Sequence, residues 1–179
     1  MRHCEKCELC KTRQNVVMGM GVPKAEILFI GEAPGAQEDE TGLPFVGRSG
    51  KLLDTFLNDI GLSRTKNIYI ANIIKCRPPQ NRDPLPAEWD ACLPYLRTQF
   101  KFLRPKIVVC LGRIAAQRIM RPDFSVMKEH GTWTVKNGTY FTATLHPAAL
   151  LRNPNNTPLA LQDFRAIQEK INELCDHTY

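Results

Sequence analysis

The chain has 179 residues and a formal net charge of +6 at pH 7, with 43% hydrophobic and 23% charged residues. No apolar run approaches the ~18 residues that a membrane span needs, so the composition argues against an integral membrane protein and against a membrane partner. It is typical of one soluble globular domain over residues 1–179. The excess of lysine and arginine favours an anionic partner such as a nucleic acid, although solvated surfaces also produce such an excess.

Three of the seven cysteines, Cys4, Cys7 and Cys10, lie within seven residues near the N-terminus. This charged segment lacks the long apolar core of a signal peptide, so we expect a cytoplasmic protein. In a reducing compartment, thiols are more often metal ligands, catalysts or small buried residues than disulfides. Cys110 and Cys175 fit the buried class, because they lie in a predicted strand and a predicted helix.

The first half of the chain alternates between predicted strands and a helix. Residues 25–31 (AEILFIG) form an apolar run that ends at a glycine and predicts a buried strand. Apolar residues between 52 and 60 recur at helical spacing, and Gly61 follows where a helix C-cap would lie. Residues 67–75 (NIYIANIIK) predict a second central strand, and four prolines in residues 77–86 then interrupt regular structure.

The second half repeats this alternation. Residues 89–103 carry a helical apolar stripe, residues 106–112 (KIVVCLG) predict a third buried strand, and residues 113–120 predict the helix after it. Residues 132–145 predict a hairpin around Asn137-Gly138 whose second arm is the fourth strand. A last helical face lies between 161 and 174. The pattern predicts an α/β fold in which a mostly parallel sheet is covered on both sides.

Three motifs follow the ends of predicted strands: residues 31–35 (GEAPG), 72–76 (NIIKC) and 145–154 (LHPAALLRNP). In open parallel sheets, ligands bind at the carboxyl ends of the strands. We therefore expect the three motifs to meet in one active site.

Four cysteines form two pairs with spacings typical of metal ligands. Cys4 and Cys7 make a C-x2-C pair, and fifteen residues separate Cys76 from Cys92. Four thiolates suit either tetrahedral zinc or a four-iron cluster, and spacing alone does not choose between them. A charged terminal segment has no core of its own, so a metal site that ties it to the domain explains these cysteines better than burial does.

Taken together, the motifs resemble the family 4 uracil-DNA glycosylases, the iron–sulfur branch of the uracil-DNA glycosylase superfamily. The resemblance covers roughly residues 4–171, and its carriers are CEKC with Arg13, GEAPGAQEDETGLPFVGRSGKLL, NIIKCRPPQNRDP, Cys92 and HPAALLRNP. It implies a three-layer α/β/α sandwich with a central four-stranded parallel sheet. It also implies a structural [4Fe-4S] cluster, whose ligands would be Cys4, Cys7, Cys76 and Cys92.

The resemblance implies a uracil-DNA glycosylase, a hydrolase that starts base-excision repair. Such an enzyme flips deoxyuridine out of single- or double-stranded DNA, hydrolyses its N-glycosidic bond and leaves an abasic site. The expected partner is uracil-containing DNA, and we expect a monomer. Related alternatives are a protein that traps uracil-DNA covalently, a glycosylase for other deaminated or oxidised bases, and an inactive partner of a replication protein. Trapping is disfavoured because no basic, histidine-containing insertion follows Asn72.

The resemblance also assigns a uracil pocket. Phe45 would be the aromatic floor on which uracil stacks, Asn72 the amide that reads uracil, and His146 the catalytic donor to uracil O2. A lone asparagine in an isoleucine-rich strand is otherwise costly, which supports a binding role. Leu150 would fill the gap that the flipped base leaves. DNA contacts are implied for Arg48, Ser49, Lys51, Leu150 and Arg152.

The segment GEAPGAQED departs from the better-known family 1 enzymes. Glu32, Ala33 and Gly35 would line the pocket. In family 1 the position of Ala33 carries a water-orienting aspartate, and that of Gly35 carries a tyrosine that excludes thymine. Both groups are missing here. Glu38 therefore becomes the candidate for orienting the attacking water, and a solvated acidic turn is the alternative explanation of the same residues.

Overall fold

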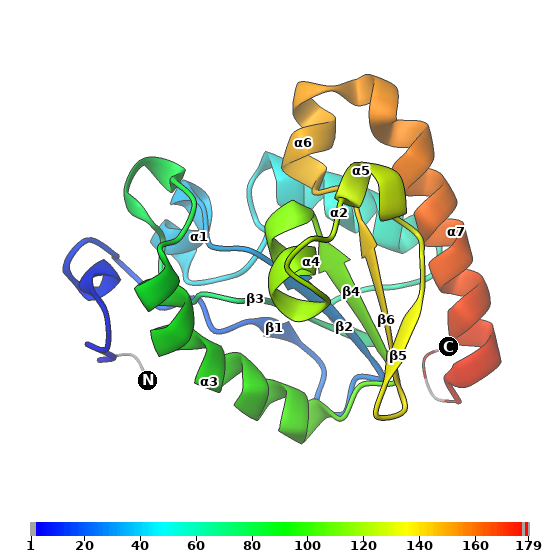
Figure 1. The fold of residues 1–179 in the computed structure, drawn as a ribbon, viewed down its shortest axis with the longest axis horizontal. Coiled ribbons are helices and arrows are strands. Elements are labelled where there is room, and N and C mark those ends of the chain that lie inside the picture. Colours follow the sequence, from blue (N-terminus) through cyan, green and yellow to red (C-terminus); the bar gives the residue numbers. More distant parts are fainter. Residues whose placement is uncertain (1–2, 177, 179) are drawn as a thin grey trace.

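One six-stranded sheet forms the centre of the computed structural model, which describes residues 3–176 and 178 (Figure 1). The strand order is β1-β3-β2-β4-β6-β5. The strands are β1 (Met20–Gly21), β2 (Ile27–Gly31), β3 (Ile68–Asn72), β4 (Ile107–Leu111), β5 (Thr134–Lys136) and β6 (Thr139–Thr144). None of the helices in the described part of the chain combines the length and apolar character that a membrane span requires.

The four inner strands, β3, β2, β4 and β6, run parallel, as predicted, and the edge strands β1 and β5 are antiparallel to their neighbours. Strand β5 is the first arm of the predicted hairpin. Its turn residues Asn137 and Gly138 have φ values of +50° and +79°, as a tight hairpin turn between twisted strands requires. Strand β1 has only two residues, so it has no periodicity that a sequence could reveal.

The longer helices lie on both faces of the sheet (Figure 1). Helices α2 (Arg48–Asp59), α6 (Pro147–Arg152) and α7 (Thr157–Leu174) pack on one face. Helices α3 (Pro86–Leu103) and α4 (Arg113–Ile119) pack on the other. The predicted three-layer arrangement is therefore confirmed. Short helices α1 (Ala36–Thr41) and α5 (Val126–Glu129) lie in connections, as do the 3-10 turns Glu8–Lys11, Pro79–Asn81 and Pro154–Asn156.

Strand β2 shows why its sequence is apolar at every position. Ile27 and Phe29 belong to the core under α2 and α7, whereas Leu28 and Ile30 belong to the core under α3 and α4. All four are at most 2% exposed. A parallel strand covered on both faces has no position that faces water, so the alternation of apolar and polar residues disappears.

The order of the strands creates a switch point beside β2. The chain moves from β2 to β3 on one side and later returns to β4 on the other. The loops that follow β2 and β4 therefore diverge, and the segments 31–35, 72–76 and 145–147 lie at the same edge of the sheet. This is the edge at which open α/β sheets bind ligands.

We expect Phe164→Ala to lower the free energy of unfolding by about 3–5 kcal/mol, because it empties a buried site. Phe164 is 2% exposed, and its ring centroid lies 5.2 Å from that of Phe56 and 6.2 Å from that of Phe29. Phe102 is 82% exposed, so Phe102→Ala is the matched control and should change stability by less than about 0.5 kcal/mol. Urea unfolding followed by circular dichroism measures both; equal losses would contradict this description of the core.

Candidate functional site

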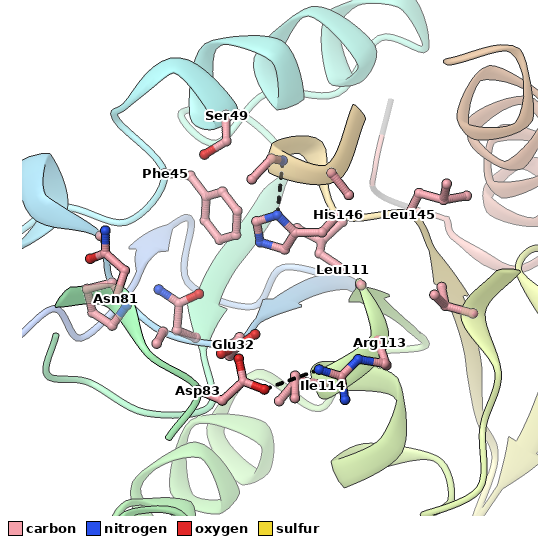
Figure 2. Close-up of a pocket in the computed structure, with 18 of the residues that line it drawn as sticks. Glu32, Phe45, Ser49, Asn81, Asp83, Leu111, Arg113, Ile114, Leu145 and His146 are labelled. Atoms are coloured by element: carbon pink, nitrogen blue, oxygen red, sulfur yellow. Dashed lines mark hydrogen bonds and ion pairs between the residues drawn. The ribbon is translucent and has the colours of Figure 1, made fainter. Parts of the chain in front are cut away.

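A pocket of about 650 Å³ lies at the carboxyl edge of the parallel strands (Figure 2). Segments after β2, β3, β4 and β6 all contribute to its walls. Many of the residues predicted from the sequence line it together: Glu32, Ala33, Gly35, Glu38, Phe45, Ser49, Asn72, His146 and Arg152. The three motifs that follow predicted strands therefore do meet at one site.

The floor of the pocket depends on the absence of a side chain at Gly31. A Cβ atom there would lie 2.4 Å from Oδ1 of Asn72 and 2.5 Å from Cζ of Phe45. Both side chains thus occupy space that only glycine leaves free. Asn72 is 1% exposed, and its Oδ1 has no hydrogen-bond partner. A buried acceptor without a donor is rare in folded proteins, so this oxygen points to a ligand that supplies an N–H group.

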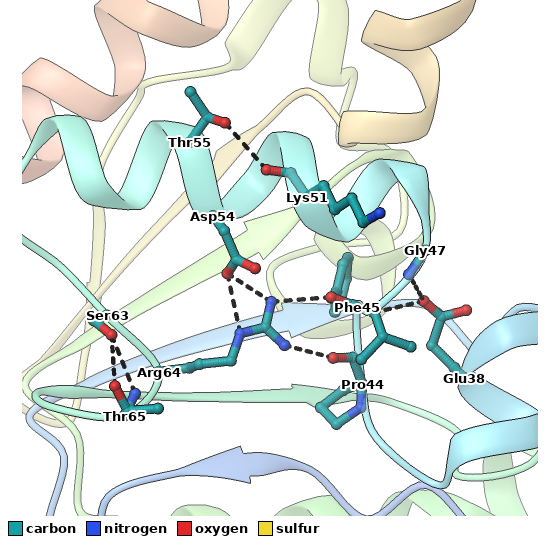
Figure 3. Close-up of polar contacts among 11 residues, drawn as sticks. Glu38, Pro44, Phe45, Gly47, Lys51, Asp54, Thr55, Ser63, Arg64 and Thr65 are labelled. Carbon is teal, nitrogen blue, oxygen red and sulfur yellow. Dashed lines mark hydrogen bonds and ion pairs between the residues drawn. The ribbon is translucent and has the colours of Figure 1, made fainter.

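Phe45 is held in an unusual backbone conformation, with φ of +52° (Figure 3). The guanidinium of Arg64 donates to the carbonyl of Pro44 at 2.6 Å and to that of Phe45 at 3.0 Å. Asp54 fixes the guanidinium through an ion pair at 2.7 Å. A Cβ atom on Gly50 would lie 1.8 Å from the Phe45 carbonyl oxygen, so the loop rests directly on the start of α2. The ring is therefore set before any ligand arrives.

His146 is the N-cap residue of α6. Its Nδ1 accepts a hydrogen bond from the backbone N–H of Ala148 at 3.1 Å, which leaves Nε2 to carry the proton of the neutral ring. Burial, assisted by the charge of Arg152, lowers the pKa of His146 to about 4, so the ring is neutral at pH 7. Its centroid lies 5.8 Å from that of Phe45. The two rings stand side by side in the pocket (Figure 2).

Glu38 is a buried structural carboxylate as well as a pocket residue. Its Oε2 accepts from the N–H of Gly35 at 3.1 Å, and its Oε1 accepts from Val46 and Gly47, both at 2.9 Å. These bonds join the start of α1 to the Phe45 loop (Figure 3). Glu38 is 8% exposed and Asp39 is 2% exposed, so a solvated acidic turn does not describe either of them.

Asp83 and Arg113, which no sequence motif indicated, line the pocket opposite the Phe45 loop and form an ion pair at 3.2 Å (Figure 2). Glu32 lies beside them. Its burial, reinforced by the charge of Asp83 and opposed by that of Arg113, raises the pKa of Glu32 to about 7. Arg113 directly follows Gly112 after β4, so the rule that ligands bind at strand ends could have identified it.

The residues expected to contact DNA divide into two groups. Arg48 and Lys51 are exposed at the start of α2, outside the pocket wall, while Ser49 and Arg152 belong to the wall. Leu150, which was predicted to fill the gap left by the flipped base, is not exposed in this structure. Leu150 is 1% exposed and packs into the core, because α6 turns it inward.

The next residue, Leu151, is 37% exposed on the same helix. It is the leucine that α6 presents to solvent. A one-residue shift on a helix rotates a side chain by roughly 100°, which accounts for the different environments of Leu150 and Leu151.

Three of the four proposed ligand sulfurs receive hydrogen bonds. The Tyr95 hydroxyl donates to Cys4 Sγ at 3.4 Å, and the backbone N–H of residue 75 donates to Cys92 Sγ at 3.2 Å. A guanidinium N–H of Arg13 faces Cys76 Sγ at 3.7 Å. Cys7 packs against the same apolar cluster that holds Cys76 and Cys92. Across residues 3–176 and 178, no group of three or more His, Cys, Asp or Glu side chains is arranged to hold a single metal ion.

Comparison with known proteins identifies the family. Residues 18–172 match the Uracil DNA glycosylase superfamily. The chain is 46% identical over 175 residues to the Type-4 uracil-DNA glycosylase of Sulfurisphaera tokodaii. The match covers 93% of this chain and 79% of that protein. It is 46% identical over 182 residues to that of Archaeoglobus fulgidus, covering 96% and 88%.

The Type-4 uracil-DNA glycosylase of Thermotoga maritima is 41% identical over 160 residues, and the match covers 87% of this chain and 82% of that protein. The Type-5 uracil-DNA glycosylase of Thermus thermophilus is 33% identical over 150 residues, covering 73% and 68%. The higher identity and coverage of the Type-4 proteins agree with the motifs quoted from the sequence. The chain belongs to the uracil-DNA glycosylase superfamily, and within it to the Type-4 family.

Proposed function

We propose that the protein hydrolyses the N-glycosidic bond of deoxyuridine in DNA, releasing uracil and leaving an abasic site that starts base-excision repair. The observation that carries this proposal is the shared pocket of Phe45, Asn72 and His146. An aromatic face, an unpartnered amide oxygen and a neutral imidazole donor are the groups that a flipped uracil requires.

Recognition rests on Phe45 and Asn72. Uracil stacks on the Phe45 ring, Asn72 Oδ1 accepts from uracil N3–H, and Asn72 Nδ2 donates to uracil O4. Cytosine lacks the N3 proton and carries an amine in place of O4, so both hydrogen bonds fail. Discrimination of this kind is strong, because the wrong base leaves buried polar groups unpaired.

Catalysis rests on stabilising the departing base. As the bond between N1 and C1′ breaks, its electron pair moves onto uracil and negative charge develops at O2. His146 Nε2–H donates to that oxygen. Because the histidine is already neutral and oriented by its contact with Ala148, no reorganisation is needed when the charge appears.

We assign the orientation of the attacking water to Glu32 and thereby revise the prediction made for Glu38. Three backbone N–H groups already occupy the Glu38 carboxylate, which suits a residue that shapes the pocket. Glu32 also lines the pocket, and its ionised form can orient a water molecule and offset positive charge on the sugar. The water oxygen bonds to C1′ and its proton passes to the carboxylate.

DNA binding follows from the exposed residues around the pocket. Arg48, Lys51 and Arg152 can contact phosphates, and the start of α2 offers backbone N–H groups beside Ser49. We propose Leu151, in place of Leu150, as the apolar residue that enters the space left by the flipped base. These contacts suit either single- or double-stranded DNA and a monomeric enzyme. A cytoplasmic location agrees with seven free cysteines.

We further propose that Cys4, Cys7, Cys76 and Cys92 hold a [4Fe-4S] cluster. The donors that face three of these sulfurs suit thiolate ligands. Four thiolates would also suit tetrahedral zinc, and the resemblance of the motifs to the iron–sulfur family favours the cluster. The bound cluster would join the N-terminal segment to the loop after β3 and to α3. Its role is structural, and the residues of the pocket carry out the reaction.

The central test is a single-turnover assay on an oligonucleotide with one uracil, followed by alkaline strand scission. We expect the protein to release uracil, and His146→Ala to lower the rate constant by about 10²–10³-fold, because one donor to the developing oxyanion is lost. Affinity for uracil-free DNA should not change. A heat-stable protein–DNA adduct or an unaffected His146→Ala rate would contradict the assignment.

The Glu32 assignment predicts a pH dependence. A carboxyl group whose pKa is about 7 is mostly protonated at pH 6 and mostly ionised at pH 8, so the single-turnover rate should rise across this interval. Glu32→Gln should be slower at pH 8 and should lose the rise. Glu40→Gln, at an exposed position of α1, is the matched control and should retain it. A rise that persists in Glu32→Gln would assign the titration to another group.

The cluster predicts colour and iron. Protein purified without air exposure should be yellow-brown, with about four iron atoms per chain. Cys76→Ser removes one ligand and should lose colour and iron, whereas Cys10→Ser removes a neighbouring thiol outside the ligand set and should keep both. Iron analysis and the visible absorption spectrum measure this. A colourless protein with one zinc per chain would exclude the cluster.

A further inference from the structure

Lys75 is buried to an unusual degree for a lysine. It is 0% exposed, and lysine is almost never fully buried unless its ammonium group is paired. Its Nζ donates to the backbone carbonyl of Asn72 at 2.6 Å and to Oε1 of Gln99 at 2.7 Å. Both acceptors are uncharged. Burial lowers the pKa of Lys75 to about 7, opposed by the charge of Cys92, so its buried amino group needs hydrogen-bond partners in either protonation state.

The Asn72 carbonyl lies at the end of β3, beyond the last residue that pairs with β1. In the peptide that joins Asn72 to Ile73, the N–H group donates to Gly31 on β2 at 2.9 Å. Because the peptide is planar and trans, its carbonyl points the other way, toward the side of β1. Strand β1 pairs only with Tyr69 and Ile70, so its ladder stops before Asn72. The Lys75 ammonium supplies the donor that a longer β1 would have supplied.

Gln99 holds the ammonium group from the other side. Its Nε2 donates to the carbonyl of Met18 at 2.7 Å and to the hydroxyl of Tyr69 at 3.3 Å, which orients Oε1 toward Lys75. Gln99 lies on α3, a long helix packed on the sheet. The ammonium is therefore fixed by a rigid element rather than by a loop.

The backbone of Lys75 is fixed as well. Its N–H donates to Cys92 Sγ at 3.2 Å, and its carbonyl accepts from Val17 at 2.7 Å. The Lys75 side chain turns back along the chain, so that its Nζ reaches the carbonyl of Asn72, three residues earlier. Lys75 does not line the pocket, so any effect on uracil must pass through Asn72.

We propose that Lys75 is a positioning residue for base recognition. Its ammonium holds the Asn72 peptide at the unpaired end of β3, and this peptide sets the position of the side-chain amide whose Oδ1 has no partner. The inference rests on the proposed recognition of uracil by Asn72, and it identifies Lys75 as the residue that keeps the Asn72 amide in position. Within the described part of the chain, this is the hydrogen bond that holds Asn72, the last residue of β3, on the side facing β1. Without the ammonium the bond is lost, and the Asn72 amide can turn away from the base.

Lys75→Met removes the ammonium and keeps most of the aliphatic chain. We expect the single-turnover rate constant on uracil DNA to fall by about 10²-fold, as misplacement of a binding group by about 1 Å can cause. Inhibition by free uracil should weaken, while affinity for uracil-free DNA and iron content stay unchanged. Lys101→Met, at an exposed lysine of α3, is the matched control and should retain full activity.

A double-mutant cycle with Asn72→Ala separates positioning from a general loss of structure. If Lys75 acts through Asn72, then Lys75→Met should change the rate by less than about twofold once Asn72 is already alanine. Equal losses in both backgrounds would overturn the proposal. Normal uracil release by Lys75→Met would also overturn it and would leave the proposed function intact. Failure of the unmodified protein to release uracil would instead overturn the proposed function.

Gln99 provides a second route if Lys75→Met does not fold. Gln99→Met removes the side-chain acceptor of the ammonium and should lower the same rate, again only when Asn72 is present. Gln99→Glu keeps an acceptor oxygen for Lys75 but loses the donor to Met18, so it should retain most of the activity. A Gln99→Glu variant as slow as Gln99→Met would mean that the Met18 contact, and not the ammonium, is what matters, and would overturn the proposal.

Discussion

The pocket depends on the pairing of Gly31 with Asn72 at the ends of β2 and β3. Because Gly31 has no side chain, the Phe45 ring and the Asn72 amide can both press against its backbone. Gly50 permits a second close approach under the Phe45 carbonyl, and Arg64 fixes the loop from outside. These contacts turn the edge of a parallel sheet into a slot with an aromatic wall and an amide at its end.

Polar groups in this slot are oriented before a ligand is present. Asn72, whose side-chain oxygen has no partner, is held at its backbone carbonyl by Lys75, and the neutral ring of His146 is held by the N–H of Ala148 at the start of α6. The free energy needed to desolvate and orient the Asn72 amide and the His146 ring is therefore spent when the protein folds, and not when the ligand binds. Preorganised dipoles of this kind contribute more to catalysis than flexible ones, because nothing has to rearrange as charge develops.

The sequence was sufficient to predict the four parallel strands and the long helices, because buried strands and amphipathic helices leave clear periodicities. The grouping of Phe45, Asn72 and His146 was predicted from the resemblance of their motifs to a known family. Helices α1, α5 and α6 were missed, since four to six residues are too few to show a helical period. The burial of Leu150 was missed for the same reason: without α6, its direction cannot be assigned. Side-chain bonds between distant segments, such as that of Arg64 with Phe45, leave no local signal at all.

The helix cap made by His146 limits what this histidine can do. With Nδ1 occupied by the N–H of Ala148, the imidazole has one fixed tautomer and no second proton to hand over near neutral pH. In the proposed mechanism, uracil then departs as an anion whose charge is shared between N1 and O2, and it collects its proton from solvent afterwards. The chemistry therefore favours pyrimidines that are good anionic leaving groups, and among bases that fit the slot, acidity at N1 should rank the rates of excision.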